Sequence, residues 1–320
     1  VQVTSEQVAI AIAGIIDSIS DDGTAGDVIL TAQGDLSLGD RITSAGYQRG
    51  GNITLTTQTS ALDTRAIALE SFSEQGQAGN ITLSAQGQLQ VGVVESYGFQ
   101  DGGDIRLSST NDSVTATDTL NSVSTRGEAG NVVIQANTTI DTAAIESAGF
   151  VQGGNINITS EDSDITIAGG LNSFSEAGIA GSVTLRTEGI LTAQEIFSEG
   201  GQQGGGVHLH GDTVDLSQGF IGSFSTAGTA GSVEITAVNN ITLGAADNGT
   251  SISSDGLTRG GTVVLTSDAG GIDVDGNIFS LAINGVAGNV SVQAQGEVSL
   301  GGDISSQSRN RGGNITITTA

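Results

Sequence analysis

A recurring pair of small residues constrains the fold more than any other feature of this sequence. Each pair, Ala-Gly or Gly-Gly, stands just before a run of alternating apolar and polar residues, and successive pairs are 24 to 30 residues apart. The second residues of the twelve pairs are Gly26, Gly51, Gly79, Gly103, Gly130, Gly154, Gly181, Gly205, Gly231, Gly261, Gly288 and Gly313. A short fixed period is typical of repeat proteins, whose units bury their apolar faces only by stacking on one another.

The pairs alternate in kind, which makes the true repeat a double turn of about 51 residues. Serines support this register. One serine lies seven residues before the second glycine of every Gly-Gly pair: Ser44, Ser96, Ser147, Ser198, Ser254 and Ser306. Before the Ala-Gly pairs, a serine lies six residues ahead in five cases (Ser20, Ser73, Ser124, Ser175 and Ser225) and eight ahead in the last, Ser280.

Each turn contains three short strand patterns, as residues 80–103 illustrate. They read NITLSA, GQLQVG, VVESYG and FQDGG, and the first segment places Ile81 and Leu83 on one face and Thr82 and Ser84 on the other. Three strands in so few residues leave no room for crossover helices. An antiparallel sandwich is the competing fold, but it would not need corners of nearly constant length. The spacing therefore predicts an all-β parallel β-helix of about 12 coils, on the order of 58 Å long.

The corners and the composition agree with this prediction. We expect glycine at the corners because left-handed backbone angles are readily adopted there only by Gly, Asn or Asp. The chain has no Pro, in keeping with strands that need every N–H for a ladder. The apolar run Val8 to Ile16 is too short to span a membrane and reads as strand. The longest insertions lie near 238–250 and 280–288 and are only a few residues, too short to build an enzyme's cleft.

Charge excludes one class of partner. The formal net charge is −26, and the nine basic residues are scattered arginines, so we expect no nucleic acid and no anionic membrane surface as partner. The chain has no Cys, so redox chemistry does not indicate a compartment.

Aromatic residues form two predicted columns. Phe72, Phe174, Phe224 and Phe279 share one place in the double turn, with Ile19 and Val123 filling the others. Tyr47, Phe99 and Phe150 share a second place, followed by Gly201, Leu257 and Arg309. We interpret the columns as a stacked apolar plug at a corner, with a carbohydrate-binding strip as the alternative.

The repeats GNITLTTQ, GNITLSAQGQL, GNVVIQANTTI, GNINITS and GNITITT, with Ser-x-Gly or Phe-Ser ahead of each small pair, carry a family resemblance. The chain resembles filamentous-haemagglutinin-like exoproteins of the cyanobacterial type over essentially its whole length. The resemblance implies right-handed coiling, two-partner secretion, and an adhesive or structural role outside a Gram-negative-type cell. Residues 1–320 show no separate N-terminal secretion domain ahead of the repeats, so we expect the export route to be a property of a longer parent chain.

Candidate chemistry is sparse. Asp273 and Asp275 would share a strand face, and one intervening coil would separate Asp215 from Asp273. We interpret these residues as solvated surface acids, with a weak Ca²⁺ site as the alternative. His208 and His210 would share an outward face, with no nearby carboxylate to complete a metal site. The sequence thus predicts no catalytic, cofactor or metal residue, and no enzyme.

The expected protein is a single β-helix domain, 1–320, that forms part of a longer extracellular filament or adhesin. Expected partners are further copies joined end to end, a surface glycan or a cell-surface receptor, without membrane insertion. A carbohydrate-binding or polysaccharide-degrading β-helix protein is the alternative function.

Overall fold

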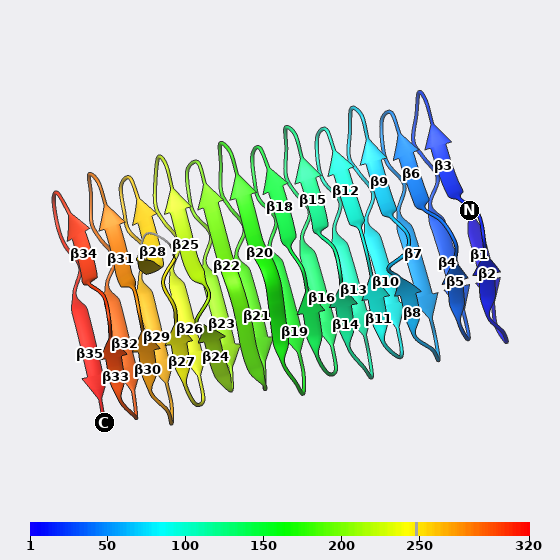
Figure 1. The fold of residues 1–320 in the computed structure, drawn as a ribbon. Helices are drawn as coiled ribbons and strands as arrows, with labels where there is room; N and C mark the ends of the chain where they lie inside the picture. The colour runs from blue at the N-terminus through cyan, green and yellow to red at the C-terminus, as the bar shows by residue number, and fades with distance from the viewer. Residues whose placement is uncertain (247–248) are drawn as a thin grey trace. The chain divides into compact units, whose positions relative to one another are not determined.

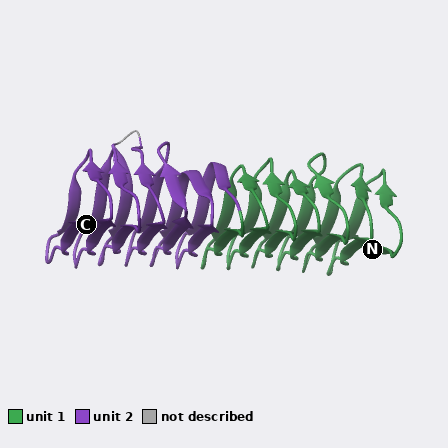
Figure 2. Ribbon diagram, turned by 90° about the horizontal axis from the view of Figure 1, so that it is seen from below, with its two compact units in different colours: residues 1–162 green, residues 163–320 purple. Residues whose placement is uncertain are grey.

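The computed structural model describes residues 1–246 and 249–320 and divides the chain into two compact units, Val1–Asp162 and Ser163–Ala320 (Figure 2). Residues 247 and 248, inside the predicted insertion near 238–250, lie outside the described residues.

The first unit repeats a coil of three strands, and each strand pairs in parallel with its equivalent in the next coil (Figure 1). The first strands of the coils are β1 (Gln2–Ser5), β4 (Val28–Ala32), β7 (Ile53–Thr57), β10 (Ile81–Ala85), β13 (Ile105–Ser109), β16 (Val132–Ala136) and β19 (Ile156–Ser160). The second strands are β2 (Ile10–Ile12), β5 (Leu36–Leu38), β8 (Leu62–Thr64), β11 (Leu89–Val91), β14 (Val114–Ala116) and β17 (Ile140–Thr142). The third strands are β3 (Ile16–Ser20), β6 (Ile42–Gly46), β9 (Leu69–Ser73), β12 (Val94–Gly98), β15 (Leu120–Ser124) and β18 (Ile145–Gly149).

The second unit has the same coil. Its first strands are β21 (Val183–Thr187), β23 (Val207–Gly211), β26 (Val233–Ala237), β29 (Val263–Ser267), β32 (Val290–Ala294) and β35 (Ile315–Thr319). The second and third strands are continuous in β20 (Ile165–Ser175) and β22 (Ile190–Gly200). Elsewhere they are separate, as β24 (Thr213–Leu216), β27 (Ile241–Leu243), β30 (Ile272–Val274) and β33 (Val298–Leu300), then β25 (Phe220–Ser225), β28 (Thr250–Gly256), β31 (Asn277–Ala282) and β34 (Ile304–Ser308).

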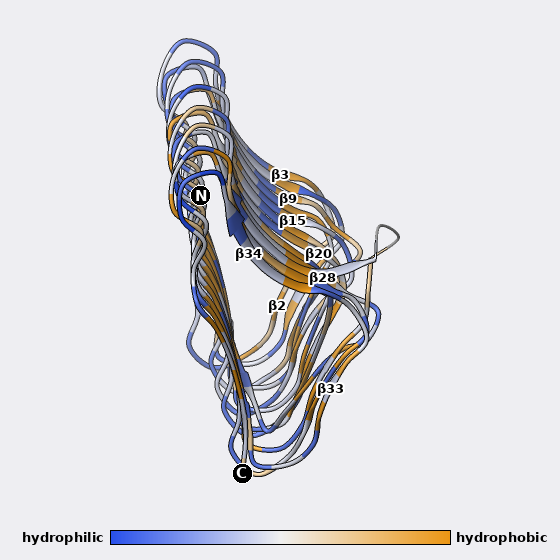
Figure 3. Cartoon of the chain, turned by 90° about the vertical axis from the view of Figure 1, so that its left-hand side faces the viewer, coloured by the Kyte–Doolittle hydropathy of each residue, from blue (hydrophilic) through white to orange (hydrophobic). Residues whose placement is uncertain are grey.

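This architecture confirms the predicted parallel β-helix of about 12 coils and excludes the antiparallel sandwich. Viewed along the coils, β3, β9 and β15 of the first unit lie one behind another (Figure 3). No helix occurs within residues 1–246 and 249–320, as expected for coils too short to hold one.

The core of each coil is thin and apolar. In β10, Ile81, Leu83 and Ala85 are buried while Thr82 and Ser84 point outward, as the alternation predicts. In-register pairing places Ile81 between Ile53 and Ile105, so equivalent apolar residues stack from coil to coil. Each fully buried Ile or Leu contributes roughly 1.5–3 kcal/mol of transfer free energy, which one isolated coil would not gain.

The early apolar run is two strands rather than one. β2 ends at Ile12 and β3 begins at Ile16, with the chain turning a corner between them. Val8 and Ile15 are exposed, at 65% and 51% of their surface. The run Val8 to Ile16 therefore combines core-facing strand residues with corner residues, which composition alone does not separate.

Candidate functional site: the glycine-corner groove

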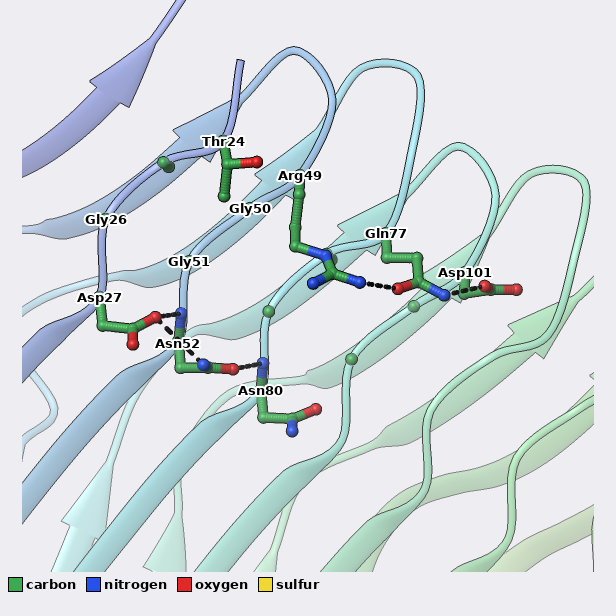
Figure 4. A pocket seen from close by; sticks show the side chains of 15 residues that line it. Thr24, Gly26, Asp27, Arg49, Gly50, Gly51, Asn52, Gln77, Asn80 and Asp101 are labelled. Carbon is green, nitrogen blue, oxygen red and sulfur yellow. Dashed lines mark hydrogen bonds between the residues drawn. The ribbon is translucent and has the colours of Figure 1, made fainter.

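The twelve small-residue pairs line one corner of the coil, between the third strand and the first strand of the next coil; we call it the glycine corner. In the first unit a groove of about 590 Å³ runs along it across four coils. Its lining residues are Thr24, Ala25, Gly26, Asp27, Arg49, Gly50, Gly51, Asn52, Gln77, Ala78, Gly79, Asn80, Asp101, Gly102 and Gly103. The floor is glycine and alanine, and longer polar side chains stand on both sides (Figure 4).

Glycine is required on the floor because successive coils approach very closely there. A Cβ added to Gly79 would lie 2.2 Å from the carbonyl oxygen of Gly51, and one added to Gly103 would lie 2.2 Å from that of Gly79. The expected left-handed angles are wrong, since within the described residues only Gly249 has a positive φ, of 76°. The corner is held in ordinary backbone conformations, and the constraint on residue type is steric contact between coils.

Within each unit a serine connects the glycine corner of one coil to that of the preceding coil; we call this arrangement the serine bridge. The Ser96 hydroxyl donates to the Gly79 carbonyl of the preceding coil at 3.0 Å and accepts from the Gly103 N–H of its own coil at 2.8 Å. The same pair of bonds is made by Ser44, Ser71, Ser122, Ser147, Ser198, Ser223, Ser254, Ser280 and Ser306. One side chain thereby satisfies a donor and an acceptor that are both buried.

The serine column of the Ala-Gly turns differs from the predicted one. The bridging serine lies eight residues before the glycine, as Ser71 does before Gly79, so Ser280 is the regular member. The serines at spacing six form a second column, in which Ser73 accepts a hydrogen bond from the Gly76 N–H at 3.0 Å. Its other members make the same local turn: Ser20, Ser124, Ser175 and Ser225. Sequence spacing alone did not tell the bridging serines from the turn serines. The bridging serine lies eight residues before the glycine in an Ala-Gly corner but seven in a Gly-Gly corner, because the Ala-Gly corner is one residue longer.

The two walls of the first unit's groove are side-chain ladders (Figure 4). On one wall the Asn52 N–H donates to Asp27 Oδ1 at 2.8 Å, and the Asn80 N–H donates to Asn52 Oδ1 at 2.9 Å. This ladder continues through Asp104, Asn131 and Asn155. On the other wall Arg49 donates to Gln77, and Gln77 donates to Asp101, both at 2.6 Å. The polar groups that border this groove thus satisfy one another.

One of the two histidines, His208, lies beside a carboxylate that was not expected from the sequence. His208 and His210 project from the outer face of β23, and His208 Nδ1 lies 3.4 Å from the Glu234 carboxylate on β26. The expectation of no nearby carboxylate is therefore wrong, because in-register pairing places Glu234 beside His208. Among the residues that the structure describes, no group of three or more His, Asp or Glu side chains is arranged to hold a metal ion.

The candidate acids lie apart, as predicted. Asp215 pairs with Thr242, and Thr242 pairs with Asp273, so one coil separates the two carboxylates. Asp273 and Asp275 are both exposed. On the far sides of the two acids, Thr192 pairs with Asp215 and Ser299 pairs with Asp273, so neither acid has an acidic neighbour in the adjacent coil at this position.

The first aromatic column, which includes Phe72, is not a plug at a corner. Phe72 and Tyr97 lie on the outer face of β9 and β12, stacked at 5.5 Å between ring centroids, and Tyr97 is 40% exposed. They point outward because their neighbours along the strand occupy the inward positions, Ser71 and Ser73 in β9 and Ser96 and Gly98 in β12.

Phe279 was assigned to the wrong column. Leu281 occupies the place that continues from Phe174 and Phe224, while Phe279 pairs with Ser253. The error has the same origin as the serine spacing, because Ser280 is equivalent to Ser223 and not to Ser225.

Asp255 is an unusual carboxylate that the sequence did not single out. It lies beside Phe224 and Leu281 on the outer face of β28, where burial raises the pKa of its carboxyl above the ordinary 3.8. The Ser253 hydroxyl donates to Oδ2 at 2.6 Å, whereas the buried Oδ1 has no hydrogen-bond partner among the described residues. The sequence does not show that Asp255 lies between Phe224 and Leu281, because this depends on the register in which neighbouring strands pair.

Two further findings bear on identity. Within residues 1–246 and 249–320 there is no helix long and apolar enough to cross a membrane. Compared with known proteins, the sequence matches no protein-family model, and it shows no significant similarity to a curated protein or to a solved structure.

Proposed function

We propose that this chain is part of a secreted or cell-surface protein of structural, adhesin type, in which the β-helix acts as a stiff scaffold. The observation that carries the proposal is the serine bridge, repeated between neighbouring coils within each unit. Nine of the ten serines named above as bridging residues are buried, and each bridge holds adjacent backbones at hydrogen-bonding distance, which favours rigidity over a hinged, substrate-closing architecture.

The outer surface is compatible with this role. Outward positions carry Thr, Ser, Asn, Gln and acidic residues, and the net charge is −26. High charge of one sign keeps long particles apart in solution. The resemblance of the repeats to filamentous-haemagglutinin-like exoproteins supports the same assignment and the proposal of export by two-partner secretion.

Surface labelling tests the proposal. Antibodies raised against the purified chain are applied to intact cells of the producing organism, before and after protease treatment of the cell surface. We expect labelling of intact cells that the protease removes. Detection of the protein only after cell lysis, with a cytoplasmic marker protein as control, would contradict the proposed location.

Carbohydrate binding is the second candidate, because several aromatic side chains are exposed on the outside. Tyr47, Tyr97 and Phe150 each expose 40% of their surface, and ring faces of this kind can stack on sugar rings. Screening the chain on a glycan array, with Tyr97→Ala beside Thr82→Ala as the matched surface control, tests this function. Equal binding by both variants would remove Tyr97 from the proposed site.

A further inference from the structure

A second groove follows the glycine corner in the second unit, and its charge is opposite to that of the first. It has a volume of about 400 Å³. Its lining residues are Arg259, Gly260, Thr262, Val286, Ala287, Gly288, Asn289, Arg311, Gly312, Gly313 and Asn314. Two arginines and no acidic residue are among them, in a chain whose net charge is −26.

Both arginines of this groove have side chains without a polar partner among the described residues. Six of the nine arginines contact an acidic, amide or aromatic side chain: Arg41, Arg49, Arg65, Arg106, Arg126 and Arg186. The side chains of Arg259, Arg309 and Arg311 make no hydrogen bond, ion pair or ring contact within residues 1–246 and 249–320. All three are exposed. An unpaired guanidinium in an otherwise acidic protein is available to bind an external anion.

The two groove arginines stand in register. Arg259 pairs with Val286, and Val286 pairs with Arg311, as parallel bridges of successive coils. Two steps of strand spacing place the backbones of Arg259 and Arg311 about 10 Å apart along the groove. Val286 stands between them and is 37% exposed, and the floor beside it is glycine and alanine, so a ligand that spans both arginines passes one apolar side chain and otherwise meets mainly backbone.

The first unit provides the contrast. Its groove contains one arginine, Arg49, which donates to Gln77, and it is lined by Asp27 and Asp101. Acidic residues are frequent at its glycine corners: Asp21, Asp22, Asp27, Glu74, Asp101, Asp104 and Glu128. The corners of the second unit at 226–232, 257–262, 283–289 and 309–314 contain none. The grooves of the two units thus carry different electrostatic surfaces.

We propose that the groove of the second unit binds a linear acidic polysaccharide, with Arg259 and Arg311 each pairing with a carboxylate or sulfate group. This deepens the adhesive part of the proposed function by naming a ligand. A linear polymer fits a groove that repeats along the coils, and paired guanidinium groups recognise planar or tetrahedral oxyanions through two parallel hydrogen bonds. Nucleic acid is disfavoured because its dense phosphates would meet the remaining acidic surface.

The test uses the purified chain and three polysaccharide probes. Polygalacturonate carries carboxylates, dextran sulfate carries sulfates, and neutral dextran carries neither. We expect binding to one or both acidic polymers, weakening as NaCl is raised, and none to neutral dextran. Binding to polygalacturonate alone assigns the carboxylate, and binding to dextran sulfate alone assigns the sulfate.

Variants locate the site. Arg259→Gln with Arg311→Gln is expected to weaken binding by roughly tenfold or more, and Arg→Lys at both positions to restore part of it. Arg49→Gln, in the first unit's groove, is the matched control and is expected to leave affinity unchanged. Because the side chains of Arg259 and Arg311 make no hydrogen bond, ion pair or ring contact among the described residues, the double variant should keep the wild-type circular dichroism spectrum and melting temperature.

Several outcomes would overturn the inference. They are unchanged affinity in the double variant, an equal loss in Arg49→Gln, equal binding of neutral dextran, or equal binding of single-stranded DNA. These measurements use purified protein and are independent of where the cell places it, so failure of surface labelling and failure of binding remain distinguishable.

Discussion

At the scale of single residues, the fold depends on serines that act as donor and acceptor at once. Ser96 is completely buried, and its hydroxyl donates to the Gly79 carbonyl and accepts from the Gly103 N–H. A hydroxyl is the smallest side-chain group able to serve both, which explains why no larger polar residue takes this position.

Replacing Ser96 by Ala should therefore destabilise the first unit. Two buried backbone groups lose their partner, at a cost of about 1–3 kcal/mol each. Hydrogen exchange of the peptide covering Gly103 and thermal unfolding measure the effect. Ser84→Ala, on the outward face of β10, is the control and should change little; an equal effect of both variants would contradict the role of the bridge.

Gly79→Ala probes the contact between coils. The new Cβ would lie 2.2 Å from the Gly51 carbonyl oxygen, so the coils must separate, at a cost of about 3 kcal/mol or more. Gly14→Ala has no atom within 4 Å of the new Cβ and should be neutral or stabilising by roughly 0.4–1 kcal/mol. Chemical denaturation measures the stability of both variants. Similar denaturation midpoints for Gly79→Ala and Gly14→Ala would contradict the prediction, because they would mean that neighbouring coils accommodate a methyl group at Gly79 at little cost.

Asp255 predicts a pH effect. Desolvation raises its pKa in the folded protein, so ionisation favours unfolding; its contribution is most favourable below the ordinary value of 3.8 and is lost as pH rises through the higher folded pKa. Asp255→Asn should then unfold at a higher temperature than the wild type at pH 7. The difference should shrink as pH approaches 4. A difference that stays constant with pH would show that the charge is not its cause.

At the scale of elements, the sequence predicted the strands well because one side of each faces the core. Period-two alternation placed Ile81 and Leu83 inside, and the structure buries both. The reason for glycine at the corner could not be predicted, because the distance between Gly79 and the Gly51 carbonyl depends on how coils stack. The outward position of Phe72 was not predicted for a related reason, since hydrophobicity alone does not tell inside from outside in so thin a coil.

The groove was only partly predictable. The glycine and asparagine columns were evident in the sequence, but the pairing of Arg49 with Gln77 and the freedom of Arg259 depend on side-chain positions across coils. Register likewise places Glu234 beside His208, although the two residues are 26 positions apart.

The double turn should be removable as a unit. Deleting residues 80–130 joins Gly79 to Asn131. The Ala-Gly corner that ends at Gly79 is then still followed by a Gly-Gly corner, at Gly154, and Ser147 can bond to Gly79 in place of Gly130. We expect a folded protein with a β-sheet circular dichroism spectrum and cooperative melting. Deleting residues 80–91 removes half a coil and should abolish both; if this variant folds equally well, stacking in register is not what holds the unit together.

At the scale of the whole molecule, like charges stack with the coils. Glu70 and Glu95 are direct neighbours on β9 and β12, and the net charge is −26. Raising NaCl from 0.01 to 0.15 M shortens the screening length from about 30 to about 8 Å and should raise the melting temperature. Glu70→Gln should reduce this salt dependence. A melting temperature that is insensitive to salt would indicate that surface repulsion contributes little.

Each serine bridge of the first unit reaches back only 17 to 20 residues, to the glycine carbonyl of the coil before it. Closing so short a segment has a low entropic cost, and a finished coil already presents the acceptor that the next serine needs. A chain that emerges N-terminus first can therefore fold in order, each winding serving as the template for the one that follows, without waiting for any distant part of the sequence to arrive.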